Sequence, residues 1–265
     1  MLISRTLNQC FLPEMNTSPV NYTSKIYTLL SAICLMINSN VYSQASSFIS
    51  ADDARRKAPL SEALEVGCVG VSLKVKLDDD GQFTCAGKSF ENVYLKNIQS
   101  NNALKSPFLI LLEMDGDSLK MMDALNTLLT PYNEMLSKRS GNSELPGKLK
   151  IIVWGDIPYA KIKTTDNLCY FALSFMKKEG VGSQIANNVG INFDDLYNWN
   201  GRESMPNMQY HSMQMNLKAV HKGGQKTFMF DAPETFNAWN ILSNAGTDYF
   251  VVKDLEKFKK YLTLE

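Results

Sequence analysis

The sequence has few of the side chains that carry most enzyme chemistry. Histidine occurs only twice, as His211 and His221, and none of the five cysteines belongs to a C-x-x-C pair. Zinc sites and disulfide frameworks need these residues in larger numbers and at closer spacings. The H-E-x-x-H and G-x-S-x-G motifs are absent. Both histidines fall on a predicted helix, where exposed surface positions are favoured over an acid–base role.

The sequence also has no excess of charge of either sign. Lysine plus arginine number 27 and aspartate plus glutamate number 27, so the formal net charge is zero. This balance gives no support to nucleic-acid binding, which usually brings a basic excess. No apolar run reaches the ~18 residues of a membrane-spanning helix. A hydrophobic content of 45% with 20% charged residues is typical of a globular chain.

The N-terminal region has the pattern of a secretory signal. Lys25 precedes the mostly apolar segment 26–37, and Val41 and Ser43 stand at the −3 and −1 positions of a signal-peptidase site. We therefore expect residues 1–43 to be a signal peptide with an upstream extension, and Met15 to be the true start. Residues 44–265 would form a single domain of a secreted or periplasmic protein. An N-terminal core helix is the alternative.

Cysteine usage fits export only loosely. Cleavage after Ser43 would leave Cys68, Cys85 and Cys169, which is an odd number. The favoured interpretation is three small buried side chains. A bridge between Cys68 and Cys85 is the alternative, because both flank the same predicted strand region.

Strand and helix patterns alternate along the rest of the chain. Strands are predicted at 70–77, 82–86, 108–114, 150–154, 168–175, 196–199, 226–230 and 249–252. Helices are predicted at 59–66, at 118–136 with a break at Pro131, at 206–221, and after the caps Asp231 and Asp254.

This alternation predicts a parallel sheet of βαβ units, closed as an α/β (β/α)₈ TIM-type barrel. A doubly wound open sheet is the alternative, but that fold normally has a glycine-rich phosphate turn. Gly180 and Gly182 offer the nearest match, and Ile185 occupies the place of the third glycine.

Four segments, in order, carry a resemblance to a known superfamily. They are Ala58-Pro59-Leu60-Ser61-Glu62-Ala63-Leu64-Glu65-Val66-Gly67, Phe90-Glu91-Asn92-Val93-Tyr94-Leu95-Lys96, Trp199-Asn200-Gly201 with Met205-Pro206, and Phe230-Asp231-Ala232-Pro233 with Trp239 and Ala245-Gly246-Thr247-Asp248. They resemble the glycerophosphodiester phosphodiesterase and phosphatidylinositol phospholipase C superfamily. The similarity is closest to its secreted branch named for altered inheritance of mitochondria.

The resemblance implies a phosphodiester-cleaving barrel. Two histidines would act as acid and base, and carboxylates at the strand ends would hold a divalent cation such as Ca²⁺ or Mg²⁺. The sequence departs from that pattern at each of these places. The two histidine positions fall on Ala51 and Gly87, and the metal carboxylates fall on Ser72 and Lys74. Glu113 alone keeps its chemical type.

One departure is reciprocal. The family has a carboxylate where this chain has Lys74, and a lysine where it has Asp115. We hypothesise that Lys74 pairs with Asp115 or Glu113, so that an internal ion pair replaces the metal, because an unpaired charge in the barrel mouth is costly. The alternative is drift in an unselected site, with the charged groups merely solvated.

These substitutions predict a catalytically degenerate phosphodiesterase-like barrel that needs no cofactor and binds a phosphorylated small molecule or a phosphodiester. The alternative is an active, metal-dependent phosphoric diester hydrolase with a relocated site. In that case Glu113, Asp115 and Asp117 would form the metal cluster, assisted by Asp52 and Asp53.

Three aromatic side chains are expected near the mouth: Trp154, Trp199 and Phe230. They have the chemistry to stack on a ligand. Packing is the favoured interpretation, because large aromatic side chains are mostly buried for their apolar area. Trp154 stands where the family has a small residue, so it is expected to fill the vacated pocket.

Overall fold

A computed structural model describes residues 47–102, 104, 107–140, 143–155, 157, 159, 168–177 and 186–263. All of them belong to one unit of the chain, Ser43–Glu265. The predicted signal peptide and the segment 180–185 therefore lie outside the described residues. Within those ranges, no helix is both long enough and apolar enough to cross a membrane.

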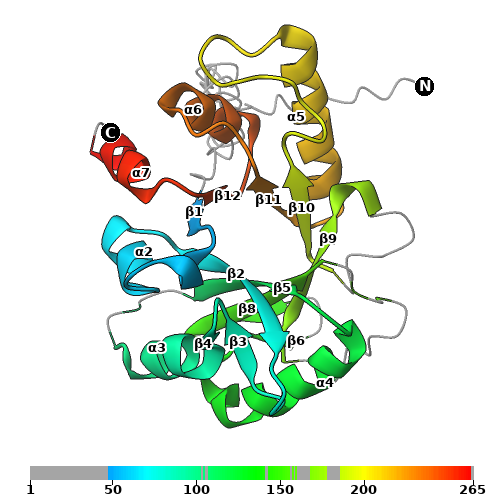
Figure 1. Cartoon of the computed structure of the whole chain (residues 1–265). Coiled ribbons are helices and arrows are strands. Elements are labelled where there is room, and N and C mark those ends of the chain that lie inside the picture. Colours follow the sequence, from blue (N-terminus) through cyan, green and yellow to red (C-terminus); the bar gives the residue numbers. More distant parts are fainter. Residues whose placement is uncertain are drawn as a thin grey trace, which may run out of the picture. The chain divides into compact units, whose positions relative to one another are not determined.

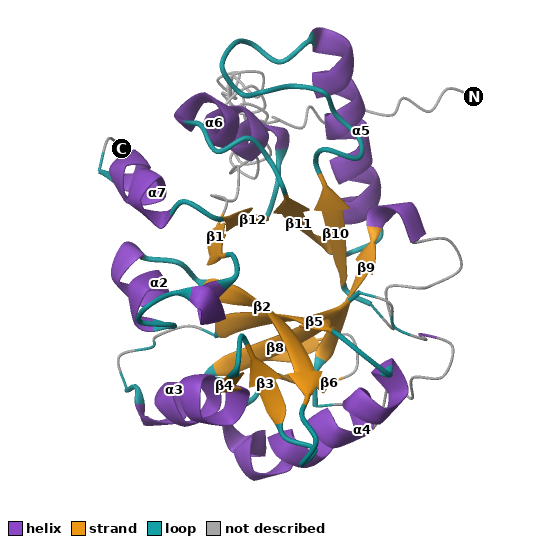
Figure 2. Cartoon of the chain, in the orientation of Figure 1, coloured by secondary structure: helices purple, strands orange, loops and turns teal. Residues whose placement is uncertain are grey.

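Eight parallel strands in the described part of the chain form a closed ring. They are β1 (Ser47–Ser50), β2 (Gly70–Leu77), β5 (Phe108–Met114), β8 (Leu149–Trp154), β9 (Tyr170–Ser174), β10 (Asn188–Asn192), β11 (Lys226–Phe230) and β12 (Tyr249–Val252). β1 pairs with β12 on one side and with β2 on the other, which closes the ring. The pairings confirm the predicted barrel, and Figure 2 shows helices surrounding the strands.

Helices and hairpins lie between successive strands, and one further helix follows β12 (Figure 1). The helices are α2 (Ser61–Val66), α3 (Lys96–Ser100), α4 (Ser118–Leu129), α5 (Asn207–Lys222), α6 (Phe236–Ala245) and α7 (Leu255–Leu262). Short helical turns span Asp53–Arg55, Glu91–Leu95, Thr130–Met135 and Phe175–Lys177. Antiparallel hairpins are formed by β2 with β3 (Phe83–Cys85), by β3 with β4 (Lys88–Ser89) and by β6 (Lys138–Ser140) with β7 (Ser143–Leu145).

The strands separate two apolar cores. β5 shows the division, because its side chains alternate between the two faces of the sheet. Leu109 and Leu111 join the cluster inside the barrel, whereas Ile110 and Leu112 pack outward against the helices. A strand buried on both faces reads as a continuous apolar run, which is why the bounds of β5 were predictable from sequence.

Several element boundaries confirm the sequence predictions. The predicted and observed ranges coincide for β2, β5, β11 and β12. α4 ends at Leu129 and continues as a 3₁₀ turn containing Pro131. Proline has no N–H to donate and disrupts the preceding helical turn, so it produces the predicted break.

The strand predicted at 196–199 is wrong. That segment contains no strand, and β10 lies earlier, at Asn188–Asn192. Its inward-facing positions alternate as asparagine, glycine and asparagine, while Val189 and Ile191 join the outer core. Because the inward positions are polar or small, this segment lacks the continuous apolar run by which a barrel strand is recognised in the sequence.

The predicted cap of α6 is also wrong. Thr235, not Asp231, caps this helix, and its hydroxyl accepts from the Ala238 N–H. Asp231 has a φ of 52° and accepts from the ammonium of Lys253 at 2.6 Å. Its carboxylate is therefore bound by a residue immediately after β12 and does not cap the helix. Asp254 caps α7 as predicted and accepts from the Lys257 N–H at 2.9 Å.

The three described cysteines are free thiols, so the alternative of a Cys68–Cys85 bridge is wrong. All three are buried. Burial raises the pKa of Cys85 to about 11 and those of Cys68 and Cys169 to about 12. A thiol with so high a pKa carries almost no thiolate at neutral pH and is a poor nucleophile.

We therefore expect native protein at pH 7 to resist iodoacetamide at Cys68, Cys85 and Cys169, because each thiol is both buried and protonated. The same residues should be alkylated completely in denaturant. Mass spectrometry of the tryptic peptides measures both states. Rapid alkylation of any of the three in native protein would contradict the packing described here.

Candidate functional site

The carboxyl ends of the strands form the barrel mouth, where TIM barrels place their sites. Lys74 on β2, Glu113 on β5 and Trp154 on β8 are in register across these parallel strands. Leu73 and Val75, the neighbours of Lys74 along β2, join the outer core. Alternation along the strand therefore directs Lys74 to the inner side of the mouth.

Lys74 makes ion pairs with both predicted partners. Its Nζ atom lies 3.8 Å from Glu113 Oε1 and 3.8 Å from Asp115 Oδ2, which confirms the predicted pairing. The three side chains are 51%, 39% and 59% exposed. Ion pairs this exposed contribute ~1 kcal/mol or less to stability. Their importance is electrostatic, because the ammonium occupies the space between two carboxylates and repels a divalent cation there.

A cavity of about 230 Å³ opens beside Lys74 and is called the β2 pocket here. Asp52, Lys74, Gly87 and Asp115 line it, together with Arg55. Gly87 belongs to the turn between β3 and β4 and has a φ of 76°. The structure thus brings the sequence-predicted positions Lys74, Gly87, Asp52 and Asp115 into one pocket, although they come from four separate segments of the chain.

A second cavity, the β1 pocket, has a volume of about 530 Å³ and shares Asp52 and Arg55 with the β2 pocket. Ala51, Asp52, Arg55, Arg56, Lys57, Glu62 and Lys253 line it. Four of these side chains are basic and two are acidic. The balance favours an anionic ligand, because arginine and lysine form charge-assisted hydrogen bonds with phosphate oxygens.

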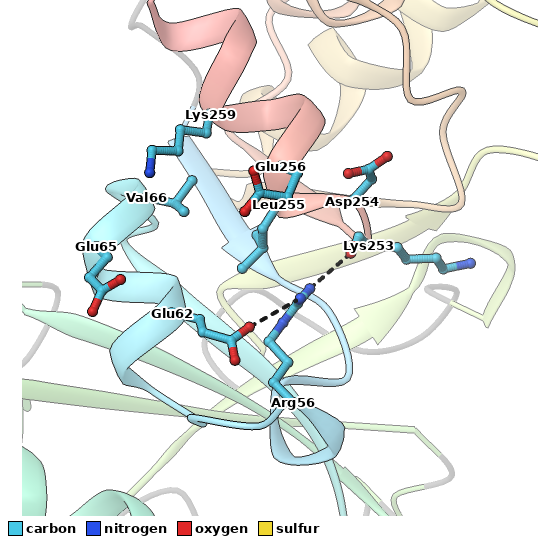
Figure 3. Close-up of a pocket in the computed structure, with 9 residues that line it drawn as sticks. All are labelled: Arg56, Glu62, Glu65, Val66, Lys253, Asp254, Leu255, Glu256 and Lys259. Carbon is cyan, nitrogen blue, oxygen red and sulfur yellow. Dashed lines mark hydrogen bonds and ion pairs between the residues drawn. The ribbon is translucent and has the colours of Figure 1, made fainter.

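Arg56 separates the β1 pocket from a third cavity of about 490 Å³ between α2 and α7. Its guanidinium donates to the Lys253 carbonyl at 2.8 Å and pairs with Glu62 at 3.8 Å (Figure 3). It also donates to Ser50 Oγ at 3.0 Å. Arg56 therefore holds the ends of β1 and β12 together, and Arg55 and Lys57 present the freer charges.

Asp53 does not belong to the mouth, contrary to its place in the predicted pocket. Its side chain is fully buried and accepts from Ser50 Oγ at 3.2 Å, the Leu60 N–H at 2.7 Å and Tyr94 OH at 2.7 Å. Burial raises the pKa of Tyr94, and the charge and hydrogen bond of Asp53 raise it further. Asp53 is a structural anchor for the loop after β1.

The alternative metal cluster of Glu113, Asp115 and Asp117 is not assembled. Asp117 caps α4, and its Oδ1 accepts from the N–H groups of Leu119 at 3.0 Å and Lys120 at 3.2 Å. Across the described ranges, no group of three or more His, Cys, Asp or Glu side chains is placed to hold a metal ion. Glu113 and Asp115 remain together only as the partners of Lys74.

Both histidines of the chain lie on the outer helix α5, as predicted, and both are exposed. His221 Nε2 lies 2.8 Å from Asp248 Oδ2. The same oxygen accepts from the N–H and the hydroxyl of Thr227, at 2.8 Å each, at the beginning of β11. This pair lies at the opposite end of the strands from the mouth, so the mouth contains no imidazole.

Two of the three predicted aromatic residues close the centre of the mouth. Trp154 and Phe230 stack with their ring centroids 4.4 Å apart and pack against the inner cluster. Gly190 makes room for this arrangement, because a Cβ there would lie 3.0 Å from Phe230 Cε2. Trp154 Nε1 is buried without a hydrogen-bond partner among the described residues. Trp154 thus packs against Phe230 and the inner cluster, and its filling of a vacated family pocket stays a prediction.

Trp199 lines neither of the two mouth pockets, contrary to its place in the predicted pocket. It packs against the outer core, 6.3 Å from the ring of Phe193, and donates to the Glu203 carbonyl at 3.0 Å.

Sequence reasoning missed the basic residues of the mouth. The available signal was the run Arg55-Arg56-Lys57 immediately after the first strand, together with Lys253 after the last.

Neither a family model nor a curated protein matches the sequence. Solved structures do match. A glycerophosphodiester phosphodiesterase from Agrobacterium tumefaciens has a TM-score of 0.50 at 12% identity, covering 81% of this chain and 99% of that protein. One from Parabacteroides distasonis has a TM-score of 0.52 at 11% identity, covering 83% and 98%. The chain therefore shares the barrel fold of these phosphodiesterases.

Proposed function

We propose that this protein is an exported, phosphodiesterase-like barrel that binds a phosphorylated small molecule or a phosphodiester at its mouth without hydrolysing it. The observation that carries the proposal is the ion pairing of Lys74 with Glu113 and Asp115. The resemblance assigns a metal-binding carboxylate to position 74. An ammonium at that place pairs with both Glu113 and Asp115, cancels one of their two negative charges and weakens their attraction for a cation.

Loss of proton transfer supports the same proposal. The resemblance puts the acid and base at Ala51 and Gly87, and neither residue has a side chain that can carry a proton. Both positions still line the mouth pockets. His211 and His221 lie outside the barrel and do not replace them.

Ligand binding is supported by the charges that remain. Arg55 and Lys57 line the β1 pocket and Lys76 lines the β2 pocket, whereas Lys253 is ion-paired with Asp231 and Lys74 with Glu113 and Asp115. The two pockets meet at Asp52 and Arg55, so one anionic group near Arg55 would be in reach of both. The ordered motifs that resemble the branch named for altered inheritance of mitochondria, together with the signal pattern in residues 1–43, support assigning the protein to that exported branch.

The purified protein is expected to show no metal-dependent hydrolysis of glycerophosphodiesters or of a chromogenic phosphodiester in Ca²⁺, Mg²⁺ or Mn²⁺. The physical reason is the missing combination of metal ligands and proton carriers. Product release measured by absorbance and by phosphorus NMR tests this. Turnover that depends on metal and disappears in Glu113→Ala would instead establish the relocated hydrolase.

Binding is tested separately by calorimetry with glycerol 3-phosphate and with glycerol. The phosphate compound should bind and glycerol should not. Arg55→Met and Lys74→Met should each weaken binding about tenfold, because each removes one charge-assisted contact. Lys218→Met on α5 is the matched control, since it removes an exposed charge outside the mouth. Equal affinity in all variants would contradict binding at the mouth.

A further inference from the structure

Two segments from different parts of the chain line the β2 pocket beside Lys74. Ala54 and Arg55 belong to the loop after β1, and Ala86 and Gly87 belong to the turn between β3 and β4. A pocket binds a ligand with less entropic cost when the segments that line it are already held in place. A contact that joins these two segments therefore affects how well the pocket binds.

The turn between β3 and β4 is tight. Cys85 pairs with Lys88 across it, so the turn consists of Ala86 and Gly87. Both have a positive φ, of 47° and 76°, as the two central residues of a type I′ hairpin turn do. The Cys85 thiol also donates to the Lys88 carbonyl at 3.7 Å. The backbone of Lys88 is thus fixed immediately beside the pocket.

The side chain of Lys88 reaches from this turn to the loop after β1. Its ammonium donates to the carbonyls of Ala54 at 2.9 Å and Arg56 at 3.0 Å. These carbonyls belong to the peptide bonds that lead into Arg55 and Lys57. Among the described residues, no other side chain of the β3–β4 hairpin forms a hydrogen bond with this loop.

The two hydrogen bonds of Lys88 are charge-assisted. Lys88 is half-buried, and an ammonium makes a stronger hydrogen bond with a carbonyl than a neutral donor does. Without the ammonium, both carbonyls would lose this donor. The loop would then be free to open, and ordering it again would cost free energy when a ligand binds.

We propose that Lys88 is a positioning residue for the anion site at the mouth. It holds the loop after β1 against the β3–β4 turn and so places Arg55 and Lys57 where an anion can meet both. This inference rests on the proposed function, because it assigns a role in the binding of the phosphate group. Lys88 is not among the described residues that line either mouth pocket, so it acts through the two carbonyls and not by contact with the ligand.

Limited proteolysis of the native full chain measures whether Lys88 holds the loop. The loop contains three consecutive trypsin sites, Arg55, Arg56 and Lys57. Lys88→Met keeps the alkyl chain and removes the ammonium, so trypsin should cleave this loop about tenfold faster than in wild type. Mass spectrometry of the fragments locates the cut. Cleavage elsewhere in the chain should keep its wild-type rate.

Calorimetry with glycerol 3-phosphate measures the effect on the site. Lys88→Met should bind about tenfold more weakly than wild type, because its loop must be ordered on binding. Lys88→Arg keeps a cation that can donate to both carbonyls, and it should recover most of the lost affinity and most of the protection from trypsin. If Lys88→Met does not fold, Lys88→Gln, which keeps a polar end without the charge, carries the same two expectations.

Lys148→Met is the matched control, and it lies outside the mouth. Lys148 is also half-buried and also donates to a carbonyl, that of Gln99 at 2.7 Å, but it precedes β8 at the opposite end of the barrel. Loop cleavage and affinity in Lys148→Met should therefore match those of wild type.

Wild-type cleavage of the loop in Lys88→Met would overturn the positioning role, whatever the affinity of the variant. Faster cleavage with unchanged affinity would overturn it too, as would a Lys88→Arg variant as altered as Lys88→Met. In each of these cases wild type still binds glycerol 3-phosphate, so the proposed function stands. If wild type itself does not bind this compound, the proposed function fails, and the role of Lys88 in binding fails with it.

Discussion

Replacing Asp53 with alanine is expected to lower the free energy of unfolding by about 3–5 kcal/mol. The carboxylate is fully buried and accepts hydrogen bonds from Ser50, Leu60 and Tyr94. Alanine leaves these donors without an acceptor and leaves a cavity. Urea unfolding followed by circular dichroism measures the change.

Asp52→Asn is the matched control for this substitution. Asp52 is the adjacent, exposed residue, with a φ of 46° that asparagine also tolerates. Its stability should stay within about 0.5 kcal/mol of wild type. If the free energy of unfolding of Asp53→Ala also stays within about 0.5 kcal/mol of wild type, the loop after β1 is held by other contacts. This loop carries Arg55 and Lys57. Asp53→Ala, which removes the hydrogen bonds that anchor the loop, should therefore also weaken anion binding at the mouth.

Lys74→Glu is expected to create a cation site where wild type has none. The substitution places a third carboxylate beside Glu113 and Asp115, whose oxygens lie 3.8 Å from Lys74 Nζ. Three carboxylates are a ligand set that Ca²⁺ favours. Saturating Ca²⁺ should raise the Tm of the variant by about 5 °C and leave wild type unchanged. Without Ca²⁺ the variant should melt lower than wild type, since its carboxylates repel.

Lys76→Glu provides the comparison for this charge reversal. It makes the same change two residues further along β2, on the same side of the strand and in the same pocket. It should gain no Ca²⁺-dependent shift, because Lys76 has no ion pair to Glu113 or Asp115. A Ca²⁺ shift of equal size in both variants would mean that the gain reflects general negative charge and not a site.

The barrel was predictable because several of its strands have clear sequence patterns. β5 and β8 have apolar side chains on both faces, and glycine or proline punctuates their surroundings. The pairing of Lys74 with Glu113 and Asp115 was predictable for a different reason. In-register parallel strands place equivalent positions side by side, so a charge exchanged between two strands implies contact.

Other features depend on folding that the sequence pattern does not encode. Asp53 looked like a pocket acid, because nothing local predicts that Tyr94, distant in the chain, donates to it. β10 was missed since its inward residues are Asn188, Gly190 and Asn192, of which Gly190 leaves room for Phe230 and Asn188 donates to the Phe171 carbonyl. Asp231 resembled a helix cap, yet Lys253, immediately after β12, binds it instead.

The pairing of β1 with β12 has a consequence for biogenesis. Ser47 lies beside Tyr249 in this ladder, so the first and last strands of the cylinder are neighbours. During synthesis β1 keeps one edge exposed until β12 has emerged. Closure of the ring thus depends on synthesis of Tyr249–Val252, and a chain that stops before Tyr249 presents an open edge to quality-control machinery.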